Sequence, residues 1–180
     1  MDNKYKGSFV ALITPFVNGK IDEASFQKFI EWQISQGTNG LVPCGTTGES
    51  PTLSHSEHER LIDLTVEVSN GRVPVMAGTG SNSTEEAINL TKYAKKAGAD
   101  SALIVMPYYN KPTQEGMYAH FEAINNAVDL PLFIYNIPGR SVIDMSVANM
   151  AQLAKLTNIV GVKDASNDPI RPTLLRNALN

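Results

Sequence analysis

Lys163 is the residue of this sequence whose position says most about chemistry. It follows the apolar run IVGV at residues 159–162, which is typical of a buried strand, so its side chain is expected where that strand ends. A neutral lysine amine in such a place can attack a carbonyl carbon and form a Schiff base. An ordinary lysine has a pKa of about 10.4, which leaves about one amine in 2,500 neutral at pH 7, so a reactive lysine needs a desolvated setting. The alternative is a structural lysine whose stem packs on apolar surface and whose ammonium group pairs with a carboxylate.

Polar side chains also follow other apolar runs. Tyr135 ends one run, and its phenol can relay protons to and from the carbinolamine that precedes a Schiff base. Thr46 and Thr47 lie between two glycines, where backbone N–H groups can face a small anion such as a carboxylate. Arg140 lies in a predicted loop and suits bidentate binding of a carboxylate. The structural alternatives are a core aromatic, a strand-to-helix turn and a surface ion pair.

The sequence offers little for a metal site. His55 and His58 are spaced i, i+3 in the first turn of a predicted helix, and no Cys or His supplies a third ligand nearby. Cys44 is the single cysteine of the sequence, which excludes an intrachain disulfide and an all-cysteine zinc site. It is interpreted as a small buried residue, with activation by a nearby helix N-terminus as the alternative. We therefore predict no metal.

The elements that must position these residues repeat along the chain. Six short apolar runs are centred near residues 11, 41, 75, 104, 134 and 161, at separations of 27 to 34 residues, and helical patterns lie between them. Ser54 with Glu57 has the signature of a capping box, and Thr84, Thr113 and Ser146 are placed to begin further helices. The order is therefore a repeated strand and helix of about 30 residues.

Two architectures fit such a repeat, a doubly wound open sheet and a (β/α) barrel. A doubly wound nucleotide binder should have a glycine-rich loop after its first strand, but TPF follows there at residues 14–16. The Gly-x-Gly that begins at Gly78 is interpreted as a tight turn. The regular period favours a TIM (β/α)8 barrel, which needs eight units and about 250 residues. We expect a single, incomplete TIM-barrel domain over residues 1–180, with about six of the eight units.

Composition narrows the class of partner. The net charge of −3 gives no general attraction to nucleic acid, and the longest apolar runs have five residues, against the roughly 20 of a membrane span. Charged residues make up 18% of the chain, below the roughly 25% of typical soluble domains, which favours association with further copies of itself. The N-terminal residues 1–6 are polar and contain no apolar signal core, so a cytoplasmic protein is expected.

Five strings at the predicted strand ends resemble the family of 4-hydroxy-tetrahydrodipicolinate synthase, also called dihydrodipicolinate synthase, of bacterial lysine biosynthesis. They are VALITPF at 10–16, GTTGE at 45–49, PYYNKP at 107–112, YNIPGR at 135–140 and GVKD at 161–164. The resemblance runs from near Lys4 to about Ser166. It implies a (β/α)8 barrel of the class I aldolase type, a homotetramer built as a dimer of dimers, and no cofactor. It also implies that the family's C-terminal units and helical tail are absent from these 180 residues.

The resemblance also implies a role for each matching residue. Lys163 is similar to the lysine that forms an imine with pyruvate, and Tyr135, Thr46 and Tyr109 are similar to the proton relay, with Tyr109 reaching into the neighbouring subunit. Thr47 resembles the binder of the pyruvate carboxylate, and Arg140 resembles the arginine that receives L-aspartate 4-semialdehyde. A further set resembles the site where L-lysine binds as a feedback inhibitor: Ser50, His55, His58, Asn82, Glu86 and Tyr108.

Two alternatives remain open. A sialic-acid lyase or a 2-keto-3-deoxy-sugar-acid aldolase of the same superfamily shares the lysine and the tyrosine, but the paired threonines and Arg140 favour the synthase. A non-catalytic fragment is the alternative of another class, because the family places further pyruvate-contacting residues beyond position 180.

Overall fold

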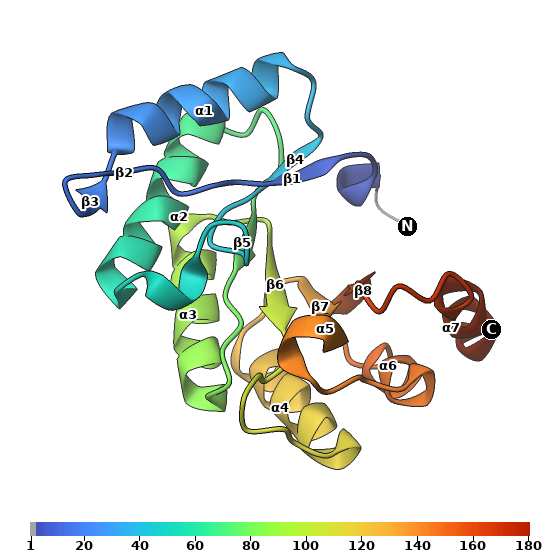
Figure 1. The fold of residues 1–180 in the computed structure, drawn as a ribbon. Coiled ribbons are helices and arrows are strands. Elements are labelled where there is room, and N and C mark those ends of the chain that lie inside the picture. The colour runs from blue at the N-terminus through green and yellow to red at the C-terminus, as the bar shows by residue number, and fades with distance from the viewer. Residues whose placement is uncertain (1–2) are drawn as a thin grey trace. The chain divides into compact units, whose positions relative to one another are not determined.

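The computed structural model describes residues 3–180, so Met1 and Asp2 of the polar N-terminal segment lie outside the described residues. The chain divides into two compact units, which we describe separately. The first unit contains the described residues up to Gly78 together with 93–102, and the second contains Thr79–Lys92 and Leu103–Asn180. Figure 1 shows how strands and helices alternate along the chain in both units.

The first unit is built on short parallel strands covered by two long helices. Its elements are η1 (Asn3–Tyr5), β1 (Phe9–Ala11), β2 (Phe16–Val17), β3 (Lys20–Ile21), α1 (Glu23–Ser35), β4 (Gly40–Val42), η2 (Ser50–Thr52), α2 (His55–Ser69), β5 (Met76–Gly78) and the end of α3 (Thr84–Ala97). β1 pairs with β4 in parallel, and a parallel bridge joins Leu41 of β4 to Val75, just before β5. Phe26 and Ile30 of α1 and Leu61 of α2 are buried in its apolar core.

The β2–β3 hairpin is an element that the periodicity of the sequence did not predict. Its two strands pair antiparallel and are mostly exposed, so they lack the buried apolar run by which the other strands were recognised. Asn18 and Gly19 connect them with φ values of 52° and 75°. Two successive positive φ angles are what a type I′ turn requires, and Asn-Gly is its preferred sequence. The Asn18-Gly19 dipeptide was therefore the feature of the sequence that could have predicted this hairpin.

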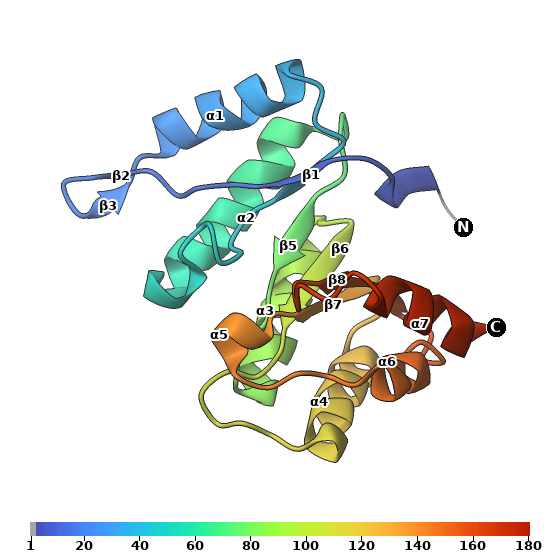
Figure 2. The ribbon, with the colours of Figure 1, turned by 45° about the vertical axis from the view of Figure 1, so that its right-hand side comes forward.

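The second unit begins with the first part of α3 and continues through the C-terminal strands. Its elements are most of β6 (Ser101–Val105), α4 (Gln114–Ala127), β7 (Leu132–Asn136), α5 (Pro138–Ser141), α6 (Val147–Leu153), β8 (Ile159–Asp164) and α7 (Arg171–Leu179). Its strands follow one another in the order β6-β7-β8, and β7 and β8 are parallel. Figures 1 and 2 both show α6 between α4 and α7, which it contacts.

The six predicted strands are confirmed as β1, β4, β5, β6, β7 and β8. The helix starts at Ser54, Thr84, Thr113 and Ser146 are confirmed as well, and Ser54 and Glu57 form the complete capping box of α2. One local expectation was wrong. Arg140 was placed in a loop, but it lies in the single helical turn α5, which Pro138 begins because its fixed φ suits the first position of a helix. No helix among residues 3–180 is long and apolar enough to cross a membrane.

Candidate active site

Lys163 and Tyr135 lie side by side on neighbouring strands of the second unit. They are register partners in the parallel pair β7–β8, so their side chains leave the sheet on the same face. The Lys163 Nζ lies 4.2 Å from the centroid of the Tyr135 ring, a cation–π contact. Tyr135 is buried, whereas Lys163 is exposed in residues 3–180 rather than enclosed as the sequence suggested. The geometry brings an amine and a phenol together at one strand end.

Two further predicted residues lie in exposed positions of the same unit. Arg140 projects from α5, which directly follows β7 and therefore begins beside the end of the strand that carries Tyr135. Tyr109 lies between β6 and α4, is 89% exposed, and has a φ of 72°. A positive φ is uncommon for a bulky residue and marks a backbone held in place by its surroundings. Its exposed ring fits the expected contact with a neighbouring subunit, which stays a prediction.

Thr46 and Thr47 belong to the first unit, so the structure does not join them geometrically to Lys163. Both are exposed in a tight turn, in which the Gly48 N–H donates to the Gly45 carbonyl over 3.1 Å. The buried Thr14 hydroxyl donates to the Gly48 carbonyl over 2.7 Å and holds the turn against the end of the first strand region. The expected turn is confirmed, while the carboxylate-binding role of the threonines stays a prediction.

The predicted lysine pocket is likewise divided between the units. In the second unit, the Ser81 hydroxyl donates to the Glu86 carboxylate. Burial and the nearby Glu86 charge raise the pKa of the Tyr108 hydroxyl above its ordinary value. The Asn110 amide donates to the backbone carbonyl of Asn82 over 3.0 Å. Ser81 and Asn110 were missed, because one polar residue in a loop carries no periodic signal.

The remaining residues of that predicted pocket lie in the first unit. Ser50 begins η2, His55 is exposed at the start of α2, and His58 is 3% exposed one turn later. His58 is buried because it lies on the apolar face of the amphipathic helix α2, which also carries Leu61 and Leu64. The structure therefore places His55 and His58 in the first turn of α2 and Ser50 in the preceding η2, and it leaves their ligand open to proposal.

Cys44 is buried in the first unit, as expected. Its thiol lies 3.5 Å from the His58 carbonyl, to which it donates, and burial raises the pKa of the thiol to about 12. A thiol with so high a pKa holds almost no thiolate at neutral pH, so the alternative of an activated nucleophile was wrong. Within residues 3–180, no group of three or more His, Cys, Asp or Glu side chains is arranged to hold a metal ion.

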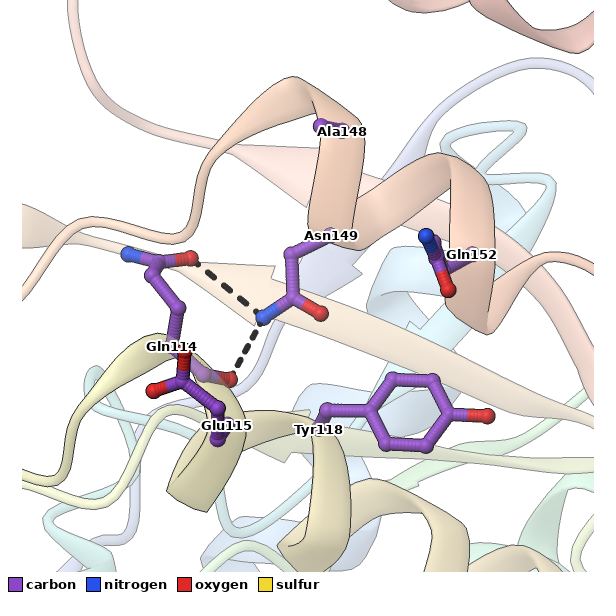
Figure 3. A pocket seen from close by; sticks show the side chains of 6 residues that line it. All are labelled: Gln114, Glu115, Tyr118, Ala148, Asn149 and Gln152. Carbon is purple, nitrogen blue, oxygen red and sulfur yellow. Dashed lines mark hydrogen bonds between the residues drawn. The ribbon is translucent and has the colours of Figure 1, made fainter.

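A shallow hollow of about 330 Å³ lies between α4 and α6, away from these residues. Figure 3 shows its lining, in which the Asn149 amide points toward Gln114. That amide donates to the Gln114 backbone carbonyl over 2.8 Å and to its side-chain oxygen over 3.3 Å. These bonds hold the two helices together, and none of the predicted site residues lines the hollow.

The parallel β/α order, with a lysine and a tyrosine at neighbouring strand ends, fits a (β/α) barrel protein of the class I aldolase type. Residues 4–177 match the model of the dihydrodipicolinate synthetase family. The chain belongs to that family.

Relatives of known name agree with the family assignment. The chain is 73% identical over 172 residues to the 4-hydroxy-tetrahydrodipicolinate synthase of Rhodospirillum centenum, covering 96% of this chain and 59% of that protein. A crystal structure of chloride-inhibited dihydrodipicolinate synthase from Acinetobacter baumannii complexed with pyruvate matches with a TM-score of 0.95 and 54% identity, over 97% of this chain and 60% of that one. A lysine-bound structure from Cyanidioschyzon merolae matches with a TM-score of 0.92 and 42% identity, over 97% and 60%.

The chain thus spans about three fifths of the length of the relatives it matches. The expected fold class is confirmed: the chain has the fold of a TIM (β/α)8 barrel of the class I aldolase type, over the part that it covers.

Proposed function

We propose that this chain supplies the Schiff-base lysine for the condensation of pyruvate with L-aspartate 4-semialdehyde to 4-hydroxy-tetrahydrodipicolinate. The observation that carries the proposal is the pairing of Lys163 with Tyr135, whose ring centroid lies 4.2 Å from the amine. The product is the one in the name of the relative that is 73% identical, and the relative complexed with pyruvate supports the choice of the first substrate. Pyruvate, the semialdehyde and L-lysine are the proposed ligands, and no cofactor is part of the proposal.

The proposed chemistry begins when the neutral Lys163 amine attacks the keto carbon of pyruvate. The resulting carbinolamine loses water to form an imine, and the Tyr135 phenol moves the protons that this step requires. Loss of a methyl proton gives an enamine, whose carbon attacks the aldehyde carbon and forms the new C–C bond. The amino group of the semialdehyde then attacks the imine carbon and displaces Lys163, so that one water is released per product.

The other predicted residues have supporting roles in the proposal. Thr46 and Tyr109 complete the proton relay, Thr47 binds the pyruvate carboxylate, and Arg140 binds the carboxylate of the semialdehyde. A carboxylate at Arg140 gains two parallel charge-assisted hydrogen bonds, which fix its orientation. We also propose a single TIM-barrel domain that assembles as a homotetramer, as the family resemblance implies, and a cytoplasmic location.

Borohydride trapping tests the imine directly. The protein should be prepared as an extended chain, meaning residues 1–180 continued to the length of the matched relatives. Incubation with pyruvate and reduction should add the mass of the reduced adduct to the peptide that contains Lys163. Lys163→Arg should abolish trapping, whereas Lys155→Arg, in the exposed turn that follows α6, should leave it unchanged. Trapping at another lysine of the folded protein would contradict the assignment.

L-lysine binding is the regulatory part of the proposal, supported by the relative that was crystallised with lysine. Glu86 would bind the ammonium group of the ligand, so Glu86→Gln should weaken binding by roughly 10- to 150-fold, the range of a charge-assisted hydrogen bond. Glu85→Gln is the matched control, because Glu85 is an exposed neighbour on the same helix. Calorimetry on the assembled extended chain measures both, and equal losses would remove this site.

A further inference from the structure

A polar cluster lies at the carboxyl ends of β7 and β8, where Lys163 and Tyr135 also lie. We define the end cluster as Asn136, Asp144, Asp164 and Arg171, all in the second unit. The Asn136 amide donates to Asp144 over 2.8 Å and to Asp164 over 3.2 Å. The Arg171 Nε donates to Asp164 over 2.8 Å, while its Nη1 and Nη2 lie 3.3 and 3.2 Å from the two Asp144 oxygens. One guanidinium therefore joins the end of β8 to the segment after α5.

Burial makes the end cluster costly to disturb. Asn136 is fully buried, and its side-chain oxygen accepts from the Met145 N–H over 3.1 Å, so both ends of the amide are used. The side chains of Arg171 and Asp164 are 13% and 17% exposed. Removing one partner from such a set leaves a desolvated polar group or charge without compensation. The cluster therefore resists rearrangement more strongly than a surface ion pair would.

The pairing of β7 with β8 contains a bulge, which bears on how the register of the two strands is held. Leu132 pairs with Ile159, but Phe133 pairs with Gly161, so Val160 is an extra residue on β8. Such a bulge disrupts the ladder locally, so the pairs before it constrain the register beyond it less than a continuous ladder would. A one-residue slip would turn every following side chain of β8 to the opposite face. A side-chain contact at the far end therefore adds to the four backbone pairs that follow the bulge.

The end cluster occupies that far end. Tyr135 pairs with Lys163, and the next pair is Asn136 with Asp164. Because successive side chains of a strand point to opposite faces, Asn136 and Asp164 lie behind the sheet when Tyr135 and Lys163 lie in front. We infer that the end cluster, through Arg171 and Asn136, fixes the register of β7 and β8 beyond the bulge and so holds the Lys163 amine beside Tyr135. Arg171 and Asn136 are positioning residues, and the kinetic consequence rests on the proposed function.

Hydrogen exchange tests the register role without any need for activity. In the extended chain, Arg171→Gln should speed amide exchange by about tenfold or more in residues 133–136 and 161–164, at the carboxyl ends of both strands. Asn158→Ala is the matched control, because Asn158 bonds to the Asn125 and Val128 carbonyls at the amino end of β8. It should loosen the amino end only. If Arg171→Gln fails to fold, Asp144→Asn, whose side chain is 46% exposed, replaces it.

Pyruvate trapping on the same variants tests the consequence for Lys163. Arg171→Gln should slow trapping roughly 10- to 100-fold, the loss expected from a misplaced reacting group, whereas Asn158→Ala should not. The pH profile adds a second signature. Burial raises the pKa of Asp164, but hydrogen bonds from Arg171, Ser166 and Asn136 lower it by a larger amount. The pKa of Asp164 therefore lies below its ordinary value. Without Arg171 that pKa rises, so the acid side of the profile should move to higher pH.

The outcomes separate the two proposals. Unchanged exchange at the strand ends in Arg171→Gln, or an equal loss of trapping in Asn158→Ala, would overturn the role of the end cluster. A failure of the unaltered extended chain to trap pyruvate would overturn the proposed function instead, while the exchange result would still decide whether the cluster sets the register.

Discussion

Arg140 offers the sharpest prediction at the scale of single residues. It is exposed on α5, beside the end of the strand that carries Tyr135, and its proposed ligand is the carboxylate of the aldehyde substrate. A charge-assisted contact contributes about 1.5–3 kcal/mol, so Arg140→Ala should lower kcat/KM for the aldehyde roughly 10- to 150-fold. Arg176→Ala, on the exposed side of α7, serves as the control in steady-state kinetics of the extended chain. An equal loss of pyruvate trapping in Arg140→Ala would contradict this role.

His120 makes stability depend on pH. It is 5% exposed, its Nδ1 lies 2.9 Å from the Thr84 hydroxyl, and burial lowers the pKa of its ring to about 4. Between about pH 6.5 and 4 the unfolded chain therefore binds a proton that the folded chain does not, so the free energy of unfolding falls as the pH falls. The loss should approach about 3 kcal/mol below pH 4.

Denaturant unfolding at pH 7, 5.5 and 4 measures this effect. His120→Gln keeps a polar side chain of similar size but removes the titration, so the slope of stability against pH should decrease across that window. A slope equal to that of the unaltered protein would show that other groups cause the acid destabilisation.

At the scale of elements, β8 depends on a glycine. A Cβ at Gly161 would collide with the ring of Phe133, its partner on β7, at the place where the bulge brings the two strands together. Gly161→Ala should lower the free energy of unfolding by about 1–3 kcal/mol, the typical cost of overpacking. Gly139→Ala in α5 is the control, because a Cβ there meets no atom within 4 Å. Thermal unfolding compares them, and a neutral Gly161→Ala would mean that the Phe133 ring moves aside without cost.

At the scale of the whole molecule, the apolar surface at the C-terminal end matters. In the described residues β8 pairs with β7 alone, and Ile170, Leu174 and Leu179 are 57%, 46% and 53% exposed. Covering three such side chains contributes on the order of 4–9 kcal/mol, comparable with a total stability of about 5–15 kcal/mol. Compared with the extended chain, an isolated polypeptide of residues 1–180 should therefore unfold less cooperatively on heating. It should also bind more of a dye that recognises exposed apolar surface, and show little condensation activity. A cooperative melt with similar activity would contradict this expectation.

The order of the elements and the residues at the strand ends can be predicted from the amino-acid sequence. Strands buried on both faces have continuous apolar runs, and helices begin at side chains that cap them, as Ser54 and Thr113 do. Such signals act over a few residues and can be read along the chain. The motifs around Lys163 and Tyr135 were sufficient to predict the family, and the assigned roles of the site residues stay predictions.

The contacts that hold those residues in place depend on the tertiary fold. The bulge at Val160 follows from pairing between strands 27 residues apart, which no local pattern of either strand specifies. The contacts of Asn136 with Arg171 through two carboxylates depend on four segments that meet only after folding. The burial of His120 is likewise set by what packs around it. The sequence around a short polar residue is the same whether its side chain faces water or a buried partner. Its role is therefore decided by contacts with residues distant in the sequence.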